Sequence, residues 1–198
     1  MSCDLCSNFC LALFFYGLFK TLSFFSYVAK HVHTFYFRKE LDLAERYGRG
    51  SWALITGANA GIGYEFCIQL AKRGFNIILL SRSSANLAAA VATLQPQFPN
   101  TKFHTIAVDY SESSLGPARF QEIAASLQEK GFDVSLLVNN AGFSAQGEFL
   151  DIDPEDIRKT LATNVGPHVL LTHALLPAMR QRARATGKRS GIIIVASV

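Results

Sequence analysis

The residues best suited to chemistry lie in a glycine-rich turn that follows the apolar run at residues 52–55. The turn reads Thr56-Gly57-Ala58-Asn59-Ala60-Gly61-Ile62-Gly63. A strand that leads through glycines into a helix leaves backbone N–H groups free at the positive end of that helix. Such a turn can hold a diphosphate group. We therefore predict that a dinucleotide contacts Gly57, Asn59, Ala60, Gly61, Ile62 and Gly63.

Two charged candidates follow the second and third apolar runs of the chain, Arg82 after residues 76–81 and Asp109 after residues 103–108. A site specific for NAD usually has an acid after its second strand, to hold the ribose 2′-OH, whereas a basic residue there suits a 2′-phosphate. Arg82 is therefore interpreted as a 2′-phosphate ligand, which makes NADP(H) the expected cofactor. The alternative is an ordinary exposed arginine. Asp109 can accept a hydrogen bond from an adenine amino group.

The fourth apolar run ends in Asn139-Asn140-Ala141-Gly142. The small side chains of Ala141 and Gly142 leave room beside a cofactor, and the amide of Asn139 can fix the central part of the sheet. All three residues are predicted to belong to the cofactor site.

Strands and helices alternate in the part of the chain that contains these candidates. Strands are predicted at residues 52–56, 76–81, 103–108, 134–138 and 191–196, and helices at residues 62–73, 85–94, 117–130 and 154–179. Pro96 is expected to close the second helix, and Pro167 to bend the last one. Alternation with continuously apolar strands predicts an α/β fold, a Rossmann-type doubly wound parallel sheet in the incomplete order 3-2-1-4-5. Ligands should then bind beyond the carboxyl ends of the strands.

Together these motifs resemble the short-chain dehydrogenase/reductase family, over residues 51–198. The resemblance also includes Asn164 and the segment Val195-Ala196-Ser197. Gly50-Ser51-Trp52-Ala53 and residues 71–76 are similar to the membrane-bound group of 17β-hydroxysteroid dehydrogenase type 12 and very-long-chain 3-oxoacyl-CoA reductase.

The resemblance implies a catalytic Asn-Ser-Tyr-Lys tetrad, in which Asn164 and Ser197 match the first two members. Tyrosine protonates the carbonyl oxygen in this family, and lysine lowers the tyrosine pKa. A Tyr-x-x-x-Lys segment should follow Ser197, but the sequence ends at Val198, and the segment Tyr16 to Lys20 lies far upstream as a chance match.

The expected function is that of an NADP(H)-dependent oxidoreductase, a carbonyl reductase or hydroxy-dehydrogenase for lipid-like substrates such as 3-oxoacyl-CoA or steroids. The given chain is expected to be C-terminally truncated after its fifth strand and to show no useful turnover alone. The alternative is a non-catalytic, truncated product that binds nucleotide or acts through a membrane anchor. Whether the chain forms a homo-oligomer is left open.

The N-terminal segment is almost wholly apolar from Phe9 to Ala29, which is long enough to cross a membrane. A spanning anchor helix is expected, although Lys20 also permits an interfacial helix, and a buried hairpin is a third alternative. Basic residues after the segment place the globular part in the cytosol by the positive-inside rule, and the resemblance implies the endoplasmic reticulum membrane. The expected domains are an anchor at residues 1–38, a linker at 39–50, and an NADP-binding domain at 51–198.

The formal net charge of +4 says little about partners. Basic and aromatic residues do not alternate in the globular part, so nucleic-acid binding is not expected. The densest basic run can be a solvated helix end or a contact with anionic lipid headgroups; it contains Arg180, Arg182, Arg184, Lys188 and Arg189. The cysteine and histidine spacings predict no metal site.

Overall fold

The computed structural model describes residues 2–37, 41–111 and 115–196, and in residues 2–8 the backbone only. The chain divides into two compact units, residues 1–41 and 42–198. The first unit is a long helix, α1 (Ser2–Val32), continued by the π-helical turn η1 (His33–Phe37). Its portion Phe9–Phe37 is long and apolar enough to cross a membrane, and none of it is buried.

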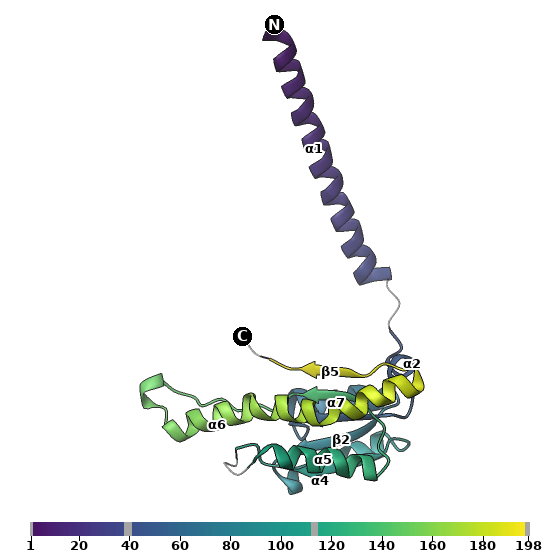
Figure 1. Ribbon diagram of the computed structural model, residues 1–198, viewed down its shortest axis with the longest axis vertical. Coiled ribbons are helices and arrows are strands. Elements are labelled where there is room, and N and C mark those ends of the chain that lie inside the picture. Colours follow the sequence, from purple (N-terminus) through teal and green to yellow (C-terminus); the bar gives the residue numbers. More distant parts are fainter. Residues whose placement is uncertain (1, 38–40, 112–114, 197–198) are drawn as a thin grey trace. The chain divides into compact units, whose positions relative to one another are not determined.

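The second unit is built on a five-stranded parallel sheet, shown in Figure 1. Its strands are β1 (Trp52–Thr56), β2 (Asn76–Ser81), β3 (Phe103–Ala107), β4 (Val134–Asn139) and β5 (Gly191–Ile194). The spatial order is β3-β2-β1-β4-β5, and every neighbouring pair is parallel. The predicted fold class and strand order are therefore confirmed.

Apolar layers cover both faces of the sheet because alternate side chains of each strand point to opposite faces. Helices α3 (Gly61–Lys72) and α4 (Ser84–Gln97) pack on the face of Ile55 and Ile77. Helices α5 (Pro117–Glu129) and α7 (Gly166–Thr186) pack on the face of Leu54 and Ile78. Within the described residues β5 pairs only with β4, and the side chains of Ile192, Ile193 and Ile194 are 37%, 38% and 62% exposed.

The two proline expectations were wrong. Pro96 lies inside the last turn of α4, which continues to Gln97, so it does not close the helix. The expected long helix is two helices, α6 (Pro154–Asn164) and α7, which meet at Val165. Pro167 lies in the first turn of α7, where a missing N–H costs nothing, so the chain starts a new helix instead of bending an old one.

Helix α6 is attached weakly to the rest of its unit. None of its residues is buried, although it ends directly against α7. The short 3-10 turn η2 (Phe149–Asp151) precedes it, with Phe149 and Leu150 exposed.

A short helix, α2 (Leu43–Tyr47), begins the second unit before β1 and joins its core through the buried Ala44. Arg182 of α7 holds it by donating to the carbonyl oxygen of Tyr47. The same guanidinium donates to Asp133 Oδ1 at 2.6 Å and to the carbonyl oxygen of Arg189 at 3.0 Å. Its side chain is only 8% exposed, so one arginine joins α2, α7 and the residues that enter β4 and β5.

Candidate functional site

The glycine-rich turn joins β1 to α3 and is fixed from the side by the segment after β4. Thr56 Oγ1 accepts hydrogen bonds from the backbone N–H groups of Asn140 and Ala141, both at 2.8 Å. The Asn140 amide nitrogen donates to the Thr56 carbonyl oxygen at 3.0 Å. These contacts bring the ends of β1 and β4 together, which places the turn at the carboxyl edge of the sheet, as predicted.

Two glycines of this turn leave no room for a side chain. A Cβ atom on Gly57 would lie 3.0 Å from the Ala141 Cα, and Gly57 has a φ of +64° that favours glycine. A Cβ atom on Gly63 would lie 2.6 Å from Asn140 Nδ2 and 2.9 Å from the carbonyl carbon of Gly57. The glycines therefore permit the close approach of turn, helix and β4 segment.

The N-terminus of α3 has free hydrogen-bond donors. Ala60 is its N-cap residue and provides no side-chain cap, and among the described residues no side chain caps the first N–H groups of the helix. This is the arrangement that binds phosphate in dinucleotide sites. Gly61 and Ile62 form the first turn of α3 and are exposed, but neither they nor Gly63 line the cavity described next.

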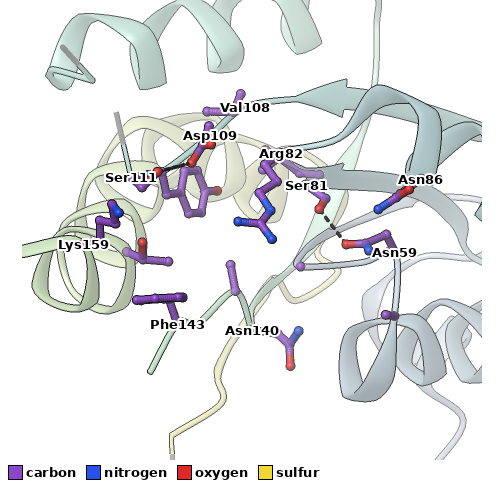
Figure 2. A pocket seen from close by; sticks show the side chains of 17 residues that line it. Asn59, Ser81, Arg82, Asn86, Val108, Asp109, Ser111, Asn140, Phe143 and Lys159 are labelled. Carbon is purple, nitrogen blue, oxygen red and sulfur yellow. Dashed lines mark hydrogen bonds between the residues drawn. The ribbon is translucent and has the colours of Figure 1, made fainter. Parts of the chain in front are cut away.

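A cavity of about 390 Å³ opens at this edge of the sheet, and Figure 2 shows it. Seven predicted cofactor residues line it: Gly57, Asn59, Ala60, Arg82, Asp109, Ala141 and Gly142. The cavity therefore gathers predicted residues from the ends of β1, β2, β3 and β4, as a dinucleotide site at the switch point requires.

Arg82 extends into the cavity from the end of β2, as Figure 2 shows. Next to it, Ser81 Oγ donates to Asn59 Oδ1 at 2.6 Å, which ties the glycine-rich turn to β2. Ser83 caps α4 by accepting from the Asn86 N–H at 3.2 Å, and Asn86 also lines the cavity. The β2 end thus offers a guanidinium, an amide and a helix N-terminus to the same space.

Asp109 presents a carboxylate to the cavity from the end of the third strand segment. Its Oδ1 accepts from the Ser111 N–H at 2.9 Å and from the Ser111 hydroxyl at 2.7 Å. These two bonds, the hydroxyl first, hold the pKa of Asp109 below its usual value, and the charge of Arg82 lowers it further. The carboxylate is therefore ionised at neutral pH, and both bonds fall on Oδ1, so Oδ2 can accept a hydrogen bond from a ligand.

Tyr110 is a lining residue that the sequence interpretation missed. It is 6% exposed, and its hydroxyl oxygen is buried and has no hydrogen-bond partner among the described residues. Burial raises the pKa of this hydroxyl well above its usual value. Because the hydroxyl oxygen is itself buried, it does not face the open cavity, and Tyr110 forms part of the packed wall beside it.

Other lining residues were also missed, because they come from elements whose place in the fold a sequence pattern does not give. Phe143 follows Gly142, and Lys159 and Thr163 belong to α6. Lys159 Nζ donates to Asp156 Oδ1 at 3.0 Å, and this bond raises the pKa of Lys159. Only Ser111 had a sequence signal, since a serine two residues after an aspartate commonly caps its side chain.

Two further predicted residues, Asn139 and Asn164, do not line the cavity. Asn139 is fully buried, and its amide nitrogen donates to Thr172 Oγ1 at 3.0 Å and to the His168 carbonyl oxygen at 3.4 Å, both on α7. Asn164, the last residue of α6, holds the Phe143 backbone from both sides: its Oδ1 accepts from the N–H at 2.8 Å and its Nδ2 donates to the carbonyl oxygen at 2.9 Å. Ser197 lies outside the described residues.

The upstream Tyr-x-x-x-Lys segment belongs to α1, in the first unit. Lys20 Nζ lies 5.4 Å from the centre of the Tyr16 ring, a cation–π contact along one helix face. Neither residue lines the cavity.

Comparison with known proteins agrees with this geometry. A family model described as short chain dehydrogenase matches residues 51–198. Very-long-chain 3-oxoacyl-CoA reductase of Coccidioides immitis is 35% identical over 140 residues, which cover 69% of this chain and 38% of that protein. The reductase of the same name from Ajellomyces capsulatus is 32% identical over 170 residues, covering 85% and 49%. The chain thus spans two fifths to one half of the length of these relatives.

Among solved structures, L-sorbose reductase from Gluconobacter frateurii, complexed with NADPH and L-sorbose, superposes with a TM-score of 0.65 at 28% identity. The superposition covers 77% of this chain and 55% of that one. The family model, the strand order and the cavity at the carboxyl edge lead to one conclusion: this chain belongs to the short-chain dehydrogenase family, in which it is similar to very-long-chain 3-oxoacyl-CoA reductases.

Proposed function

We propose that this chain binds NADP(H) as the cofactor half of a membrane-anchored oxidoreductase that acts on carbonyl or hydroxy groups of lipid-like substrates. The observation that carries the cofactor assignment is Arg82, whose guanidinium extends into the cavity where an NAD-specific site would have an acid. The named relatives support a long acyl-CoA substrate, and steroids are a second class of similar apolar chemistry.

The residues present fit an NADP(H) molecule. The uncapped N–H groups at the start of α3 would hold the diphosphate, and Gly57 keeps the turn open beside it. Arg82 would pair with the 2′-phosphate, and Asp109 would accept from the adenine amino group. When bound, the nicotinamide would supply or accept the hydride.

The segment after β4 is held in place by a residue that we assign a positioning role. Asn164 fixes Phe143 by two hydrogen bonds, and Phe143 forms the wall of the cavity next to Gly142. Asn164 would therefore fix the position of Phe143 in that wall, in addition to the proton-relay role that the family resemblance implies. We also propose that Ser197 would bond to the substrate oxygen.

The helix Phe9–Phe37 is proposed to anchor the protein in the endoplasmic reticulum membrane, with the second unit in the cytosol. No Tyr-x-x-x-Lys segment follows Ser197 in the 198 residues. We therefore expect this chain to bind NADPH without steady turnover of a ketone, because the general acid that is typically worth about 10²–10⁴-fold in rate is not among them.

The test is a titration of the full chain, held in a mild detergent, with NADPH and with NADH. We expect tighter binding of NADPH, and Arg82→Gln should weaken it about tenfold while leaving NADH affinity unchanged, as expected for one lost charged hydrogen bond at an exposed site. Arg119→Gln is the control, since Arg119 pairs with Glu122 on α5 outside the cavity. Equal affinity of the wild-type chain for both nucleotides would contradict the assignment of Arg82.

A further inference from the structure

Basic side chains gather at the edge of the sheet where the strands begin, opposite the cavity. Because all five strands are parallel, their first residues lie along one edge. The chain enters every strand just after an exposed basic residue: Arg49, Lys72, Lys102, Lys130 and Lys188 for β1 to β5 in turn. Figure 1 shows α2 beside the C-terminal end of α7 at the same edge. We call this surface the entry face.

Charge is sorted between the two edges of the sheet. Besides the nearly buried Arg182, the entry face carries nine basic residues: Arg46, Arg49, Lys72, Arg73, Lys102, Lys130, Arg184, Lys188 and Arg189. Its four acidic residues are Asp42, Glu45, Glu129 and Asp133, and two of these already pair with Arg49 at 3.0 Å and Arg182 at 2.6 Å. Among described residues the cavity edge has the opposite excess: Asp109, Glu148, Asp151, Asp153, Glu155 and Asp156 against Arg82, Arg158 and Lys159.

The second unit receives the chain from the apolar helix at this same face. Asp42, the N-cap of α2, stands five residues after Phe37 in the sequence. The Arg189 N–H donates to the Arg46 carbonyl oxygen at 3.1 Å, so the basic loop before β5 lies directly against α2. The basic residues of the entry face are thus joined to the very segment that leads to the proposed anchor.

We propose that the entry face docks on an anionic phospholipid surface. This inference rests on the membrane anchor in the proposed function, because the anchor is what brings a bilayer to this face. Basic groups next to a membrane are attracted to anionic lipids, and the attraction falls off within a Debye length of about 8–10 Å. Docking in this orientation leaves the cofactor cavity, at the other edge of the sheet, open to the aqueous phase.

The experiment reconstitutes the full chain into nanodiscs of phosphatidylcholine alone or with one fifth phosphatidylserine. A neutral amine-reactive reagent then labels lysines, and mass spectrometry measures each rate. We expect Lys72, Lys102, Lys130 and Lys188 to react about threefold more slowly on the anionic discs, because a negative surface potential keeps nearby amines protonated. Lys159, at the cavity edge, should react equally on both, and salt should remove the difference.

Two charge-matched variants separate an oriented contact from bulk attraction. Lys102→Gln/Lys188→Gln lowers the net charge by two on the entry face, and Gln121→Glu/Gln146→Glu lowers it by two at exposed positions elsewhere. The first should reduce the slowing at Lys72 and Lys130, because it removes two of the basic residues of the entry face, and the second should preserve it. Equal slowing at Lys159 or an equal loss of slowing in both variants would overturn the proposal. It would also be overturned if the entry-face lysines already reacted as slowly on neutral discs as on anionic ones. That last result, together with a dimer that sediments in detergent, would assign the face to a second copy of the chain.

The pattern of lysine labelling does not depend on whether NADPH binds. Failure of the chain to assemble with neutral nanodiscs would refute the anchor itself, and failure of NADPH to bind would refute the cofactor assignment while leaving the lysine pattern unchanged.

Discussion

Replacing Gly63 by alanine tests the close approach on which the glycine-rich turn depends. The new Cβ atom would lie 2.6 Å from Asn140 Nδ2 and 2.9 Å from the Gly57 carbonyl carbon. Asn140 is not free to retreat, because the same nitrogen donates to the Thr56 carbonyl oxygen at 3.0 Å. The backbone of Gly57 must therefore move, and with it the turn that would hold the diphosphate.

The two opposing effects can be weighed. Overpacking a tight site costs typically 1–3 kcal/mol, and contact with backbone atoms belongs at the upper end of that range. Alanine gains about 1 kcal/mol over glycine inside a helix. The free energy of unfolding should therefore fall by about 2 kcal/mol, which lowers the urea midpoint by about 1 M for an m-value of about 2 kcal/mol/M. NADPH affinity should fall at least tenfold.

Trp52 provides the assay, since it is the single tryptophan of the chain and stacks on Phe132 with ring centroids 4.1 Å apart. Its fluorescence during urea unfolding of the full chain in detergent reports on the second unit. Gly166→Ala is the control, because a Cβ atom there meets nothing within 4 Å and the position lies at the start of a helix. If Gly63→Ala unfolds at the same urea concentration as Gly166→Ala, the steric argument fails.

Three further predictions concern stability and reactivity. Arg182→Ala should lower the free energy of unfolding by about 2 kcal/mol, since it removes two backbone contacts of a nearly buried guanidinium and its ion pair with the half-exposed Asp133. The exposed Arg180→Ala should change it by less than about 0.5 kcal/mol, and similar urea midpoints for both variants would refute the role of Arg182. Ser111 lowers the pKa of Asp109 in the folded state, so the ionised carboxylate adds stability at neutral pH that is lost as the pH falls below about 4. The difference in urea midpoint between wild type and Asp109→Asn should therefore shrink as the pH is lowered from 7 to 3. A difference that stays constant over this range would contradict the role of Ser111. Burial raises the pKa of Cys67 to about 12, so iodoacetamide should alkylate the Cys67 peptide only after unfolding, as mass spectrometry can measure, and native labelling would be inconsistent with this environment.

The sheet was predictable because its strands are continuously apolar and separated by glycine or proline signals. The first two predicted strands agree with β1 and β2 at both ends, and the later ones differ by no more than two residues. The break at Val165 was not predictable in the same way. A proline in an apolar helical pattern can either bend one helix or begin another, and only the packing of α7 on the sheet decides between them.

The candidate site was predictable where it depends on strand ends. A parallel sheet brings those ends to one edge, so Arg82 and Asp109 meet in the cavity although 27 positions separate them. The direction in which each side chain points was harder to predict from the sequence. Asn139 points to α7 and Asn140 to the glycine-rich turn, a difference of one residue along a strand that alternates faces. Lys159 had no sequence signal, because the position of α6 follows from the break at Val165.

The two sides of the cavity differ in how tightly they are packed. Its β-strand ends are buried in the sheet, whereas its other side is α6, which buries no residue of its own and ends at an interruption of the helix. Local opening costs least where few apolar contacts must be broken. Amide hydrogens of α6 should therefore exchange well ahead of those in β1 or β4, and a nucleotide would enter from the α6 side without any rearrangement of the sheet.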